Sequence, residues 1–266
     1  MLTVETYATL SEAAGALRER SRYLGGGTLV MRAANYGDQG FERIVRSRDP
    51  GLVDIRGEGT SIRIGAGVTM AMIAQSAELA FLAPAARAVG GPAIRNMATV
   101  GGNLFAETPY GDVATALLAL DSSVQMADGA RLPLEQFLQS RGTQRGLVAA
   151  VTVPRPGQDA FRFLKVSRVK PKGVAVMTLA AWLPLQGGRV SGARVAFGAM
   201  GPIPMRARAV ENALEGATLD EDGITRSLAV ATEGLSPADD SLASAWYRRE
   251  VAPVHLKRLL LGEGRA

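Results

Sequence analysis

Residues 94–104 read IRNMATVGGNL and residues 25–30 read GGGTLV, and these two glycine-bearing stretches decide how the chain is interpreted. Each sets adjacent glycines beside a hydroxyl or amide side chain, Thr28 in the first stretch and Thr99 and Asn103 in the second. Without a Cβ, glycine adopts positive φ and lets successive backbone N–H groups converge on an anion. The pair suits a pyrophosphate held from two sides, although two tight turns explain the same spacing equally well.

The familiar phosphate-binding motifs fit this chain poorly. The nearest approach to G-x-G-x-x-G is IGAG at residues 64–67, which lacks the third glycine. No lysine follows a glycine run in the way that a Walker A loop requires. A phosphate site in this protein therefore indicates a nucleotide-binding fold other than the Rossmann or P-loop types.

Composition limits the chemistry that the chain itself can perform. The 266 residues are 47% hydrophobic and 21% charged, as in a globular protein of one or two domains. The absence of cysteine excludes disulfides, thiolate nucleophiles and iron-sulfur clusters ligated by this chain. The single histidine, His255, excludes a His-rich metal centre, and a packing or surface role for it is favoured over a general base. Any redox or hydrolytic chemistry must therefore depend on a bound cofactor or on carboxylates, and we assign no catalytic side chain and no metal ligands.

Charge and hydropathy bear on the binding partners and the cellular location of the protein. The net charge is +5, but the basic residues are spread along the chain with few aromatics between them, so nucleic-acid binding is not expected. The N-terminus lacks a basic region followed by an apolar run, which argues against a signal peptide. The longest apolar stretch, residues 174–185, is too short to span a bilayer. These features predict a cytoplasmic protein without a membrane span.

Periodicity predicts mixed helix and strand before about residue 155 and an α+β arrangement after it. Capping residues suggest where several helices begin: Ser11 for a helix over 12–20, Thr69 for a helix over 70–79, and Asp112 before a helix from 113. The PRPG at residues 154–157 is a predicted linker. Strand-like runs then cover 161–166, 174–183 and 189–197, and helical patterns cover 206–214, 218–232 and 244–261.

Several conspicuous side chains have ordinary interpretations. Trp182 and Trp246 are predicted to be core residues rather than cofactor-stacking ones. Met70 and Met72 lie on a predicted helix and are assigned to core packing. Near the C-terminus, a group of basic residues forms either a solvated helix face or a docking surface for another subunit. These residues are Arg248, Arg249, Lys257 and Arg258.

The run at residues 94–104, continued by Pro109 and Asp112, closely resembles the FAD-binding subunits of the molybdenum hydroxylases, the family of xanthine dehydrogenase and aerobic carbon monoxide dehydrogenase. Further segments match in the same order, so the resemblance extends from about residue 23 to about residue 260. They are GGT at 26–28, IGAGVT at 64–69, ALD at 119–121, FLKVSR at 163–168, YR at 247–248 and LKR at 256–258.

The resemblance implies an α+β protein with a defined domain order. The expected FAD-binding domain covers residues 1–155 and is of the vanillyl-alcohol-oxidase-like (PCMH) type, with two α/β subdomains over about 1–56 and 57–155. A C-terminal α+β domain, an antiparallel sheet with helices, is expected over residues 160–266. This order agrees with the change of pattern near Pro154.

The resemblance also implies the cofactor and its ligands. The two glycine loops would hold the FAD pyrophosphate, Asp112 would accept hydrogen bonds from ribityl or ribose hydroxyls, and Lys165 and Leu147 would lie near the flavin. From the residues alone, Asp112 can equally cap the following helix, and Lys165 can be a solvated strand residue. The cofactor-binding set is Gly25, Gly26, Gly27, Thr28, Leu29, Val30, Thr99, Val100, Gly101, Gly102, Asn103, Asp112, Leu147 and Lys165.

The function that the resemblance implies is electron transfer within a complex. The FAD on this chain would take electrons from a separate iron-sulfur small subunit and pass them to NAD, a quinone or oxygen, while a molybdopterin large subunit oxidises the substrate. The expected assembly is a dimer of heterotrimers, a heterohexamer. Lys172 and Gly173 depart from the pattern of many relatives at a position that bears on flavin shielding. A stand-alone FAD oxidoreductase and a flavin-free scaffold subunit are the alternatives.

Overall fold

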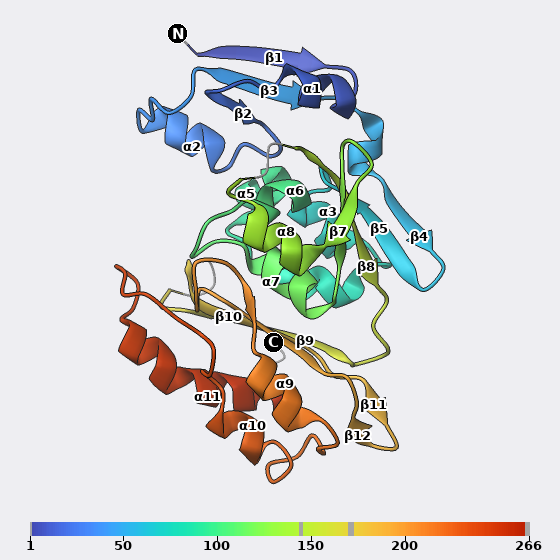
Figure 1. The fold of residues 1–266 in the computed structure, drawn as a ribbon, viewed down its shortest axis with the longest axis vertical. Coiled ribbons are helices and arrows are strands. Elements are labelled where there is room, and N and C mark those ends of the chain that lie inside the picture. Colours follow the sequence, from blue (N-terminus) through green and yellow to red (C-terminus); the bar gives the residue numbers. More distant parts are fainter. Residues whose placement is uncertain (1, 144–145, 170–172, 264–266) are drawn as a thin grey trace.

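The computed structural model describes residues 2–143, 146–169 and 173–263, and it arranges them in three successive layers (Figure 1). The N-terminal layer contains a three-stranded parallel sheet in the order β1-β3-β2. Its elements are β1 (Thr3–Tyr7), α1 (Leu10–Ala16), β2 (Ser21–Tyr23), α2 (Val30–Asn35), β3 (Arg43–Ser47) and the 3-10 turn η1 (Pro50–Val53).

The middle layer pairs a five-stranded antiparallel sheet, in the order β4-β5-β8-β6-β7, with a group of short helices. Its strands are β4 (Ile55–Glu58), β5 (Ser61–Gly65), β6 (Ser123–Met126), β7 (Arg131–Pro133) and β8 (Val148–Pro154). Its helices are α3 (Met70–Gln75), the 3-10 turn η2 (Ala80–Leu82), α4 (Ala83–Arg87), α5 (Pro92–Met97), α6 (Val100–Leu104), α7 (Asp112–Ala119) and α8 (Leu134–Ser140).

The C-terminal layer is an antiparallel sheet in the order β14-β13-β10-β9, with helices on its outer face (Figure 1). Its strands are β9 (Phe161–Ser167), β10 (Ala175–Trp182), β13 (Arg194–Gly198) and β14 (Met205–Arg206), and β11 (Leu185–Gln186) pairs separately with β12 (Arg189–Val190). Its helices are α9 (Arg208–Leu214), α10 (Thr225–Ala229) and α11 (Ala245–Leu261). The α+β class expected from the pattern is confirmed.

Helix α7 joins the middle and C-terminal layers. All of its residues are buried, and it packs against β10 and β13 on the face of the sheet opposite α9 and α11. A Cβ on Gly198 would lie 2.2 Å from Thr178 Oγ1 and 2.4 Å from Thr115 Oγ1, so only glycine allows this close approach. Ala180 and Ala196 of the C-terminal sheet belong to the same apolar cluster as the middle layer. The domain boundaries near residue 155 stay a prediction.

Several predicted helix boundaries are confirmed and others are wrong. Thr69 caps α3 by accepting from Met72 N–H, and Ser244 caps α11 in the same way from Tyr247 N–H. The first helix, however, is capped by Thr9 rather than Ser11, because Glu12 at the third helical position completes a capping box with Thr9. The pattern over 70–79 ends as a helix at Gln75, and that over 218–232 forms a regular helix only in α10.

Two side-chain predictions on α11 are also wrong. Trp246 is 68% exposed rather than in the core, whereas Arg248, predicted to lie on the surface, is 1% exposed. Trp182 packs against the middle-layer core as predicted, and its ring also lies 5.4 Å from the Arg194 guanidinium carbon. Met70 is buried and Met72 packs against the same core. Within the described residues, no helix has both the length and the apolar character needed to cross a membrane.

Candidate functional site

The two glycine loops lie directly against each other. A Cβ built on Gly25 would be 2.8 Å from Thr99 Oγ1, and one built on Gly26 would be 1.7 Å from the carbonyl oxygen of Met97. Real Cβ atoms do not approach other heavy atoms so closely, and at Gly26 the clash would be with the backbone, so the loops can stack in this way only because residue 26 is glycine. The first glycines of the 25–30 stretch therefore serve the contact between the two loops as well as any ligand.

The first loop presents unpaired hydrogen-bond donors. Within the described part of the chain, no acceptor receives the backbone N–H groups of residues 25–29. Gly27 has a φ of +76°, a conformation that glycine adopts without strain, and Leu29 is the N-cap of α2 with no side-chain cap. Consecutive unpaired N–H groups of this kind form a concavity that suits an anion such as a phosphate.

The second loop uses its donors internally. Val100 N–H donates to Val68 O, Gly101 N–H to Ala66 O and Gly102 N–H to Thr99 Oγ1, at 2.9, 2.8 and 3.2 Å. Asn103 is buried, and its Oδ1 accepts from Ala114 N–H at 2.8 Å inside α7. The spacing suggested two equivalent phosphate-binding loops, but the geometry differs: this loop supports the first one and orients α7.

Asp112 and Lys165 form a buried ion pair beside these loops. Lys165 Nζ, on β9, lies 2.7 Å from Asp112 Oδ2 and donates to Ala88 O at 2.9 Å. Asp112 Oδ1 is buried and has no hydrogen-bond partner among the described residues. Burial raises the pKa of Asp112, and the Lys165 ammonium opposes that shift. The unpartnered oxygen leaves one acceptor available for a donor from outside the chain.

The alternatives for these two residues are resolved by their positions. The N-cap of α7 is Gly111, with a φ of +99°, so Asp112 is the first helical residue and does not cap the helix through its side chain. Lys165 is largely buried, which excludes the solvated-strand interpretation. Leu147, also predicted to lie near a ligand, is buried in the apolar cluster of the middle layer, directly before β8.

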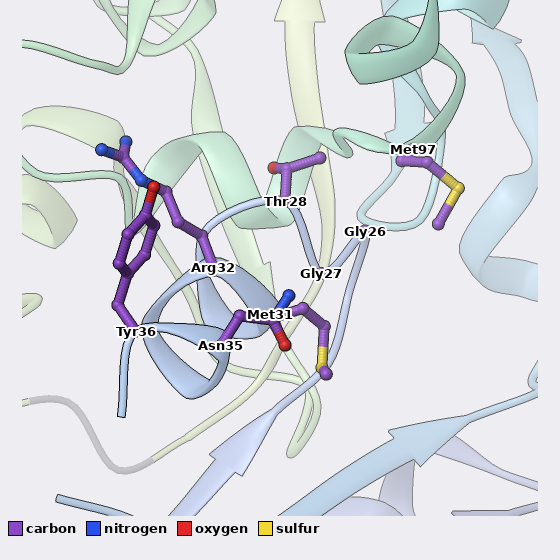
Figure 2. A pocket seen from close by; sticks show the side chains of 8 residues that line it. All are labelled: Gly26, Gly27, Thr28, Met31, Arg32, Asn35, Tyr36 and Met97. Carbon is purple, nitrogen blue, oxygen red and sulfur yellow. The ribbon is translucent and has the colours of Figure 1, made fainter. Parts of the chain in front are cut away.

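A cavity of about 510 Å³ opens beside the first loop (Figure 2). Its walls include Gly26, Gly27 and Thr28, which the sequence predicted, and five residues that it did not. Four of these come from α2 and its C-cap, where Met31 and Asn35 form one i, i+4 pair and Arg32 and Tyr36 form another. The fifth is Met97, at the end of α5. For the four residues of α2 and its C-cap, the i, i+4 spacing directly after the loop is the signal that could have identified them, whereas Met97 has no such signal.

Arg32 links α2 to the loop that precedes α7. Its Nη1 donates to Tyr110 Oη at 2.8 Å, and its guanidinium carbon lies 5.7 Å from the centre of the Tyr36 ring. The hydrogen bond to Tyr110 raises the pKa of Arg32, so the residue is cationic at any working pH. The cavity therefore carries a fixed positive charge at its α2 side.

Of the two residues that depart from the pattern of many relatives, Lys172 and Gly173, the structure describes only the second. Lys172 lies outside the described residues. Gly173 N–H donates to Val169 O at 2.7 Å, and a Cβ on Gly173 would lie 2.3 Å from that same oxygen. The glycine at 173 is thus required by a tight turn of the backbone itself.

The ion pair supports a prediction with a defined pH dependence. Replacing Lys165 with methionine is expected to lower the free energy of unfolding by about 3 kcal/mol at pH 7, because Asp112 stays buried without its cation. Without Lys165 the native pKa of Asp112 rises further above its ordinary value of 3.8, so the native state binds a proton that the unfolded state releases. The variant therefore loses stability as pH rises, and the difference from wild type shrinks on acidification.

Urea denaturation from pH 4 to pH 8 measures this difference. Lys257→Met is the matched control, because Lys257 pairs with Glu221 at the surface, where such pairs contribute less than about 1 kcal/mol. A loss for Lys165→Met that is independent of pH, or no larger than that of the control, would contradict the assignment.

The comparisons with known proteins agree and together cover nearly the whole chain. The family model of the FAD binding domain in molybdopterin dehydrogenase matches residues 2–156, and that of the CO dehydrogenase flavoprotein C-terminal domain matches residues 162–262. The carbon monoxide dehydrogenase medium chain of Afipia carboxidovorans is 30% identical over 82% of this chain and 80% of its own length. Subunit alpha of the 6-hydroxypseudooxynicotine dehydrogenase complex of Paenarthrobacter nicotinovorans is 31% identical over 80% of this chain and 76% of its own.

Structural comparison supports the same fold. A chain of the reconstituted CO dehydrogenase from Oligotropha carboxidovorans superposes with a TM-score of 0.88 at 24% identity, covering 98% of this chain and 96% of that one. The matching family model extends over more than half of the residues, and it includes both glycine loops and Asp112. The chain therefore belongs to the family of FAD-binding subunits of the molybdopterin-dependent dehydrogenases.

Proposed function

We propose that this protein holds one FAD between its glycine loops and the Asp112–Lys165 pair, and that it transfers electrons from a separate iron-sulfur subunit to an external acceptor. The observation that carries the proposal is the row of N–H groups at residues 25–29, which have no acceptor among the described residues and belong to a loop stacked on the second glycine loop. The absence of cysteine requires that any iron-sulfur cluster be ligated by another subunit.

The residues fit the cofactor at two places. The N–H groups of residues 25–29 and the Thr28 hydroxyl suit the anionic oxygens of the pyrophosphate. Asp112 Oδ1, buried and unpartnered, suits a neutral hydroxyl such as those of a ribityl chain or ribose. Thr99 and Gly102 lie next to Gly25 of the first loop, so they border the proposed pyrophosphate site on that side.

Lys165 has a positioning role in this proposal. It is held by Asp112 and by Ala88 O, so it opposes the rise in the pKa of Asp112 that burial causes and fixes the direction in which Oδ1 points. When bound, FAD supplies the conversion between a two-electron step and single-electron transfer, and the protein supplies binding, orientation and electrostatics. No side chain is required as an acid or base, and we assign none as catalytic.

The assembly that we propose is based on the descriptions of the relatives. Those relatives are described as a medium chain and as a subunit of a dehydrogenase complex. We propose an iron-sulfur small subunit and a molybdopterin large subunit as partners, in a cytoplasmic dimer of heterotrimers. The acceptor is NAD, a quinone or oxygen, and the substrate of the complex is chosen by the molybdopterin subunit.

The decisive experiment is the visible spectrum of the purified full chain, with the released cofactor identified by chromatography. The proposal expects flavin absorption and about one FAD per chain. Purification from the native host then separates the remaining possibilities: recovery with iron and molybdenum supports the complex, and an active lone chain supports a stand-alone oxidoreductase. A correctly folded protein that contains no flavin and takes up none would refute the proposal and favour a scaffold.

A glycine substitution tests the site without disturbing the fold. Gly102 is exposed, and a Cβ there would meet only Thr99 Oγ1, at 3.1 Å, so a side chain has room outside the packed core. Gly102→Leu is expected to keep the thermal transition within a few degrees of wild type and to reduce FAD affinity at least tenfold, because the added side chain would crowd the pyrophosphate proposed to bind at the first loop. Fluorescence titration with FAD measures the affinity, and thermal denaturation measures the transition.

Gly157→Leu is the matched control, because a Cβ on Gly157 would meet only Ala160 Cβ, at 4.0 Å, in the loop between β8 and β9. Unchanged FAD affinity in Gly102→Leu would show that the cofactor does not lie beside the stacked glycine loops.

A further inference from the structure

Arg141 is a half-buried cation to which the proposed cofactor grip gives no role. It is the C-cap of α8, and its Nη1 donates to Leu104 O at 3.0 Å and to Ala106 O at 2.9 Å. Burial lowers the pKa of Arg141, and the Glu107 carboxylate opposes that shift. Among the described residues no ion pair includes Arg141. Because removing a cation from water without a counter-charge costs free energy, the purpose of Arg141 must lie in the carbonyls that it holds.

The two carbonyls belong to the segment that joins the second glycine loop to Asp112. Leu104 is the last residue of α6, and the final carbonyls of a helix have no partner within it. In the described part of the chain, no backbone N–H outside the regular helices and strands donates to Leu104 O or to Ala106 O. Arg141 therefore supplies hydrogen bonds that the backbone of this segment does not make for itself.

A second residue of α8 grips the same segment. Phe137 is fully buried, and Phe105 packs on it edge-to-face with the ring centres 5.3 Å apart. Phe137 and Arg141 are four residues apart, so they lie on one face of the helix. Helix α8 also packs on α7 in the middle layer (Figure 1). One face of α8 thus holds residues 104–106 against the start of α7.

The chain turns back after Ala106 and brings Asp112 beside this grip. A Cβ built on Gly111 would be 3.7 Å from Ala106 O. Gly111 is the N-cap of α7, with a φ of +99°, and Asp112 follows it directly. The carbonyl that Arg141 holds therefore packs against the residue that sets the direction in which Asp112 leaves the turn.

The far side of the segment has anchors of its own. Thr108 Oγ1 donates to Gly201 O at 3.0 Å, and Tyr110 Oη accepts from Arg32 Nη1 at 2.8 Å. Neither contact involves α8. Loss of Arg141 is therefore expected to loosen the near side of the segment without unfolding the protein.

We propose that Arg141 is a positioning residue of the cofactor site and that it acts through Asp112. By holding the carbonyls of Leu104 and Ala106, it fixes the turn from which α7 begins and hence the place of Asp112 Oδ1. This oxygen is buried and has no partner among the described residues, so it can serve a hydroxyl of the cofactor only where distance and angle are right. The inference rests on the proposed FAD-binding function and adds a residue, outside both glycine loops, on which FAD affinity depends.

Fluorescence titration of the full-length protein with FAD tests the inference. Arg141→Met is expected to keep the thermal transition within a few degrees of wild type and to weaken FAD binding about five- to fiftyfold. Methionine occupies a similar volume but donates to neither carbonyl. Arg141→Lys is expected to bind FAD within about threefold of wild type, because an ammonium group can still donate to both oxygens.

A double-mutant cycle with Asp112→Asn tests the route of the effect. The amide has one oxygen in place of two, so with that oxygen on Lys165 the acceptor at the position of Oδ1 is lost and FAD binding weakens. In this background Arg141→Met is expected to change FAD affinity by less than about twofold, since Asp112 is no longer there to be positioned. A residue that only stabilised the fold would give the same loss in both backgrounds.

Arg18→Met is the matched control, because Arg18 Nη1 also donates to two carbonyls at the end of a helix, those of Gly15 and Leu17 at 2.6 and 2.9 Å. It should leave FAD affinity unchanged. Unchanged affinity in Arg141→Met, an equal loss in the Asp112→Asn background, no rescue by lysine, or loss of the cooperative thermal transition would each overturn the positioning role and leave the flavoprotein function intact. Failure of wild type to bind FAD would instead overturn the proposed function, and this inference with it.

Discussion

Gly26→Ala is expected to lower the free energy of unfolding by about 3 kcal/mol or more and to abolish measurable FAD binding. The added Cβ would lie 1.7 Å from Met97 O, 2.5 Å from Met97 C and 3.0 Å from Ala98 Cα. All of these are backbone atoms, so no side-chain rotation can relieve the clash. The loop must move away from residues 97–98, and its unpaired N–H groups then no longer converge.

Thermal denaturation and flavin titration together measure this effect. Gly15→Ala is the control, because Gly15 lies in α1 with nothing within 4 Å of a built Cβ. Alanine there should stabilise the protein by about 0.5–1 kcal/mol through higher helix propensity. If Gly26→Ala were as stable as wild type and bound FAD normally, the stacking of the two glycine loops described above would be wrong.

Arg248→Met is expected to lower the free energy of unfolding by about 3–5 kcal/mol. The Arg248 side chain is almost fully buried, and its guanidinium holds several segments of the C-terminal layer together. Nε donates to Val176 O at 2.9 Å, Nη1 to the carbonyls of Ala238 and Ala243, and Nη2 to Asp240 Oδ2 at 2.8 Å. Methionine fills a similar volume but donates to none of these acceptors.

The neighbouring Arg249→Met is a sensitive control for this prediction. Arg249 is exposed on the same helix, so its loss should change stability by no more than about 0.5 kcal/mol. Urea denaturation of the two variants compares one substitution in two environments. Equal effects would show that Arg248 does not form the hydrogen bonds described. Loss of FAD affinity is not expected in Arg248→Met protein that remains folded, because the residue lies in the C-terminal layer and contacts neither glycine loop.

Local patterns predicted the elements that depend on local interactions. Thr69, predicted as a cap, accepts a hydrogen bond from an N–H three residues later, and Ser244, predicted only as the start of a helical pattern, does the same. At the first helix two hydroxyl residues compete, and the capping box with Glu12 selects Thr9 over Ser11. On α11 the sequence offers adjacent arginines, and only the packing against β10 and β9 determines which is buried.

For the same reason, the sequence predicted only part of the candidate site. Glycine pairs beside hydroxyl and amide residues are visible in the sequence, so both loops were identified. The different roles of the two loops were not predicted, because the N–H groups of the second loop donate to Val68 and Ala66, some thirty residues earlier. Met31 and Asn35 were missed because their i, i+4 spacing is common in helices and becomes informative only once the opposing wall, which includes Met97, is known.

The sequence by itself determined the family, the α+β class, the glycine loops and the absence of any cluster ligand in this chain. Each of these depends on residue identity or on spacing over a few positions. The tertiary structure alone decided that Asp112 faces Lys165, that Arg248 is buried and that a cavity lies beside α2. Asp112 and Lys165 are 53 residues apart, and Arg248 and Val176 are 72 apart. Contacts over such separations form only when the layers pack, because packing brings the partners together and excludes the water that would otherwise satisfy them.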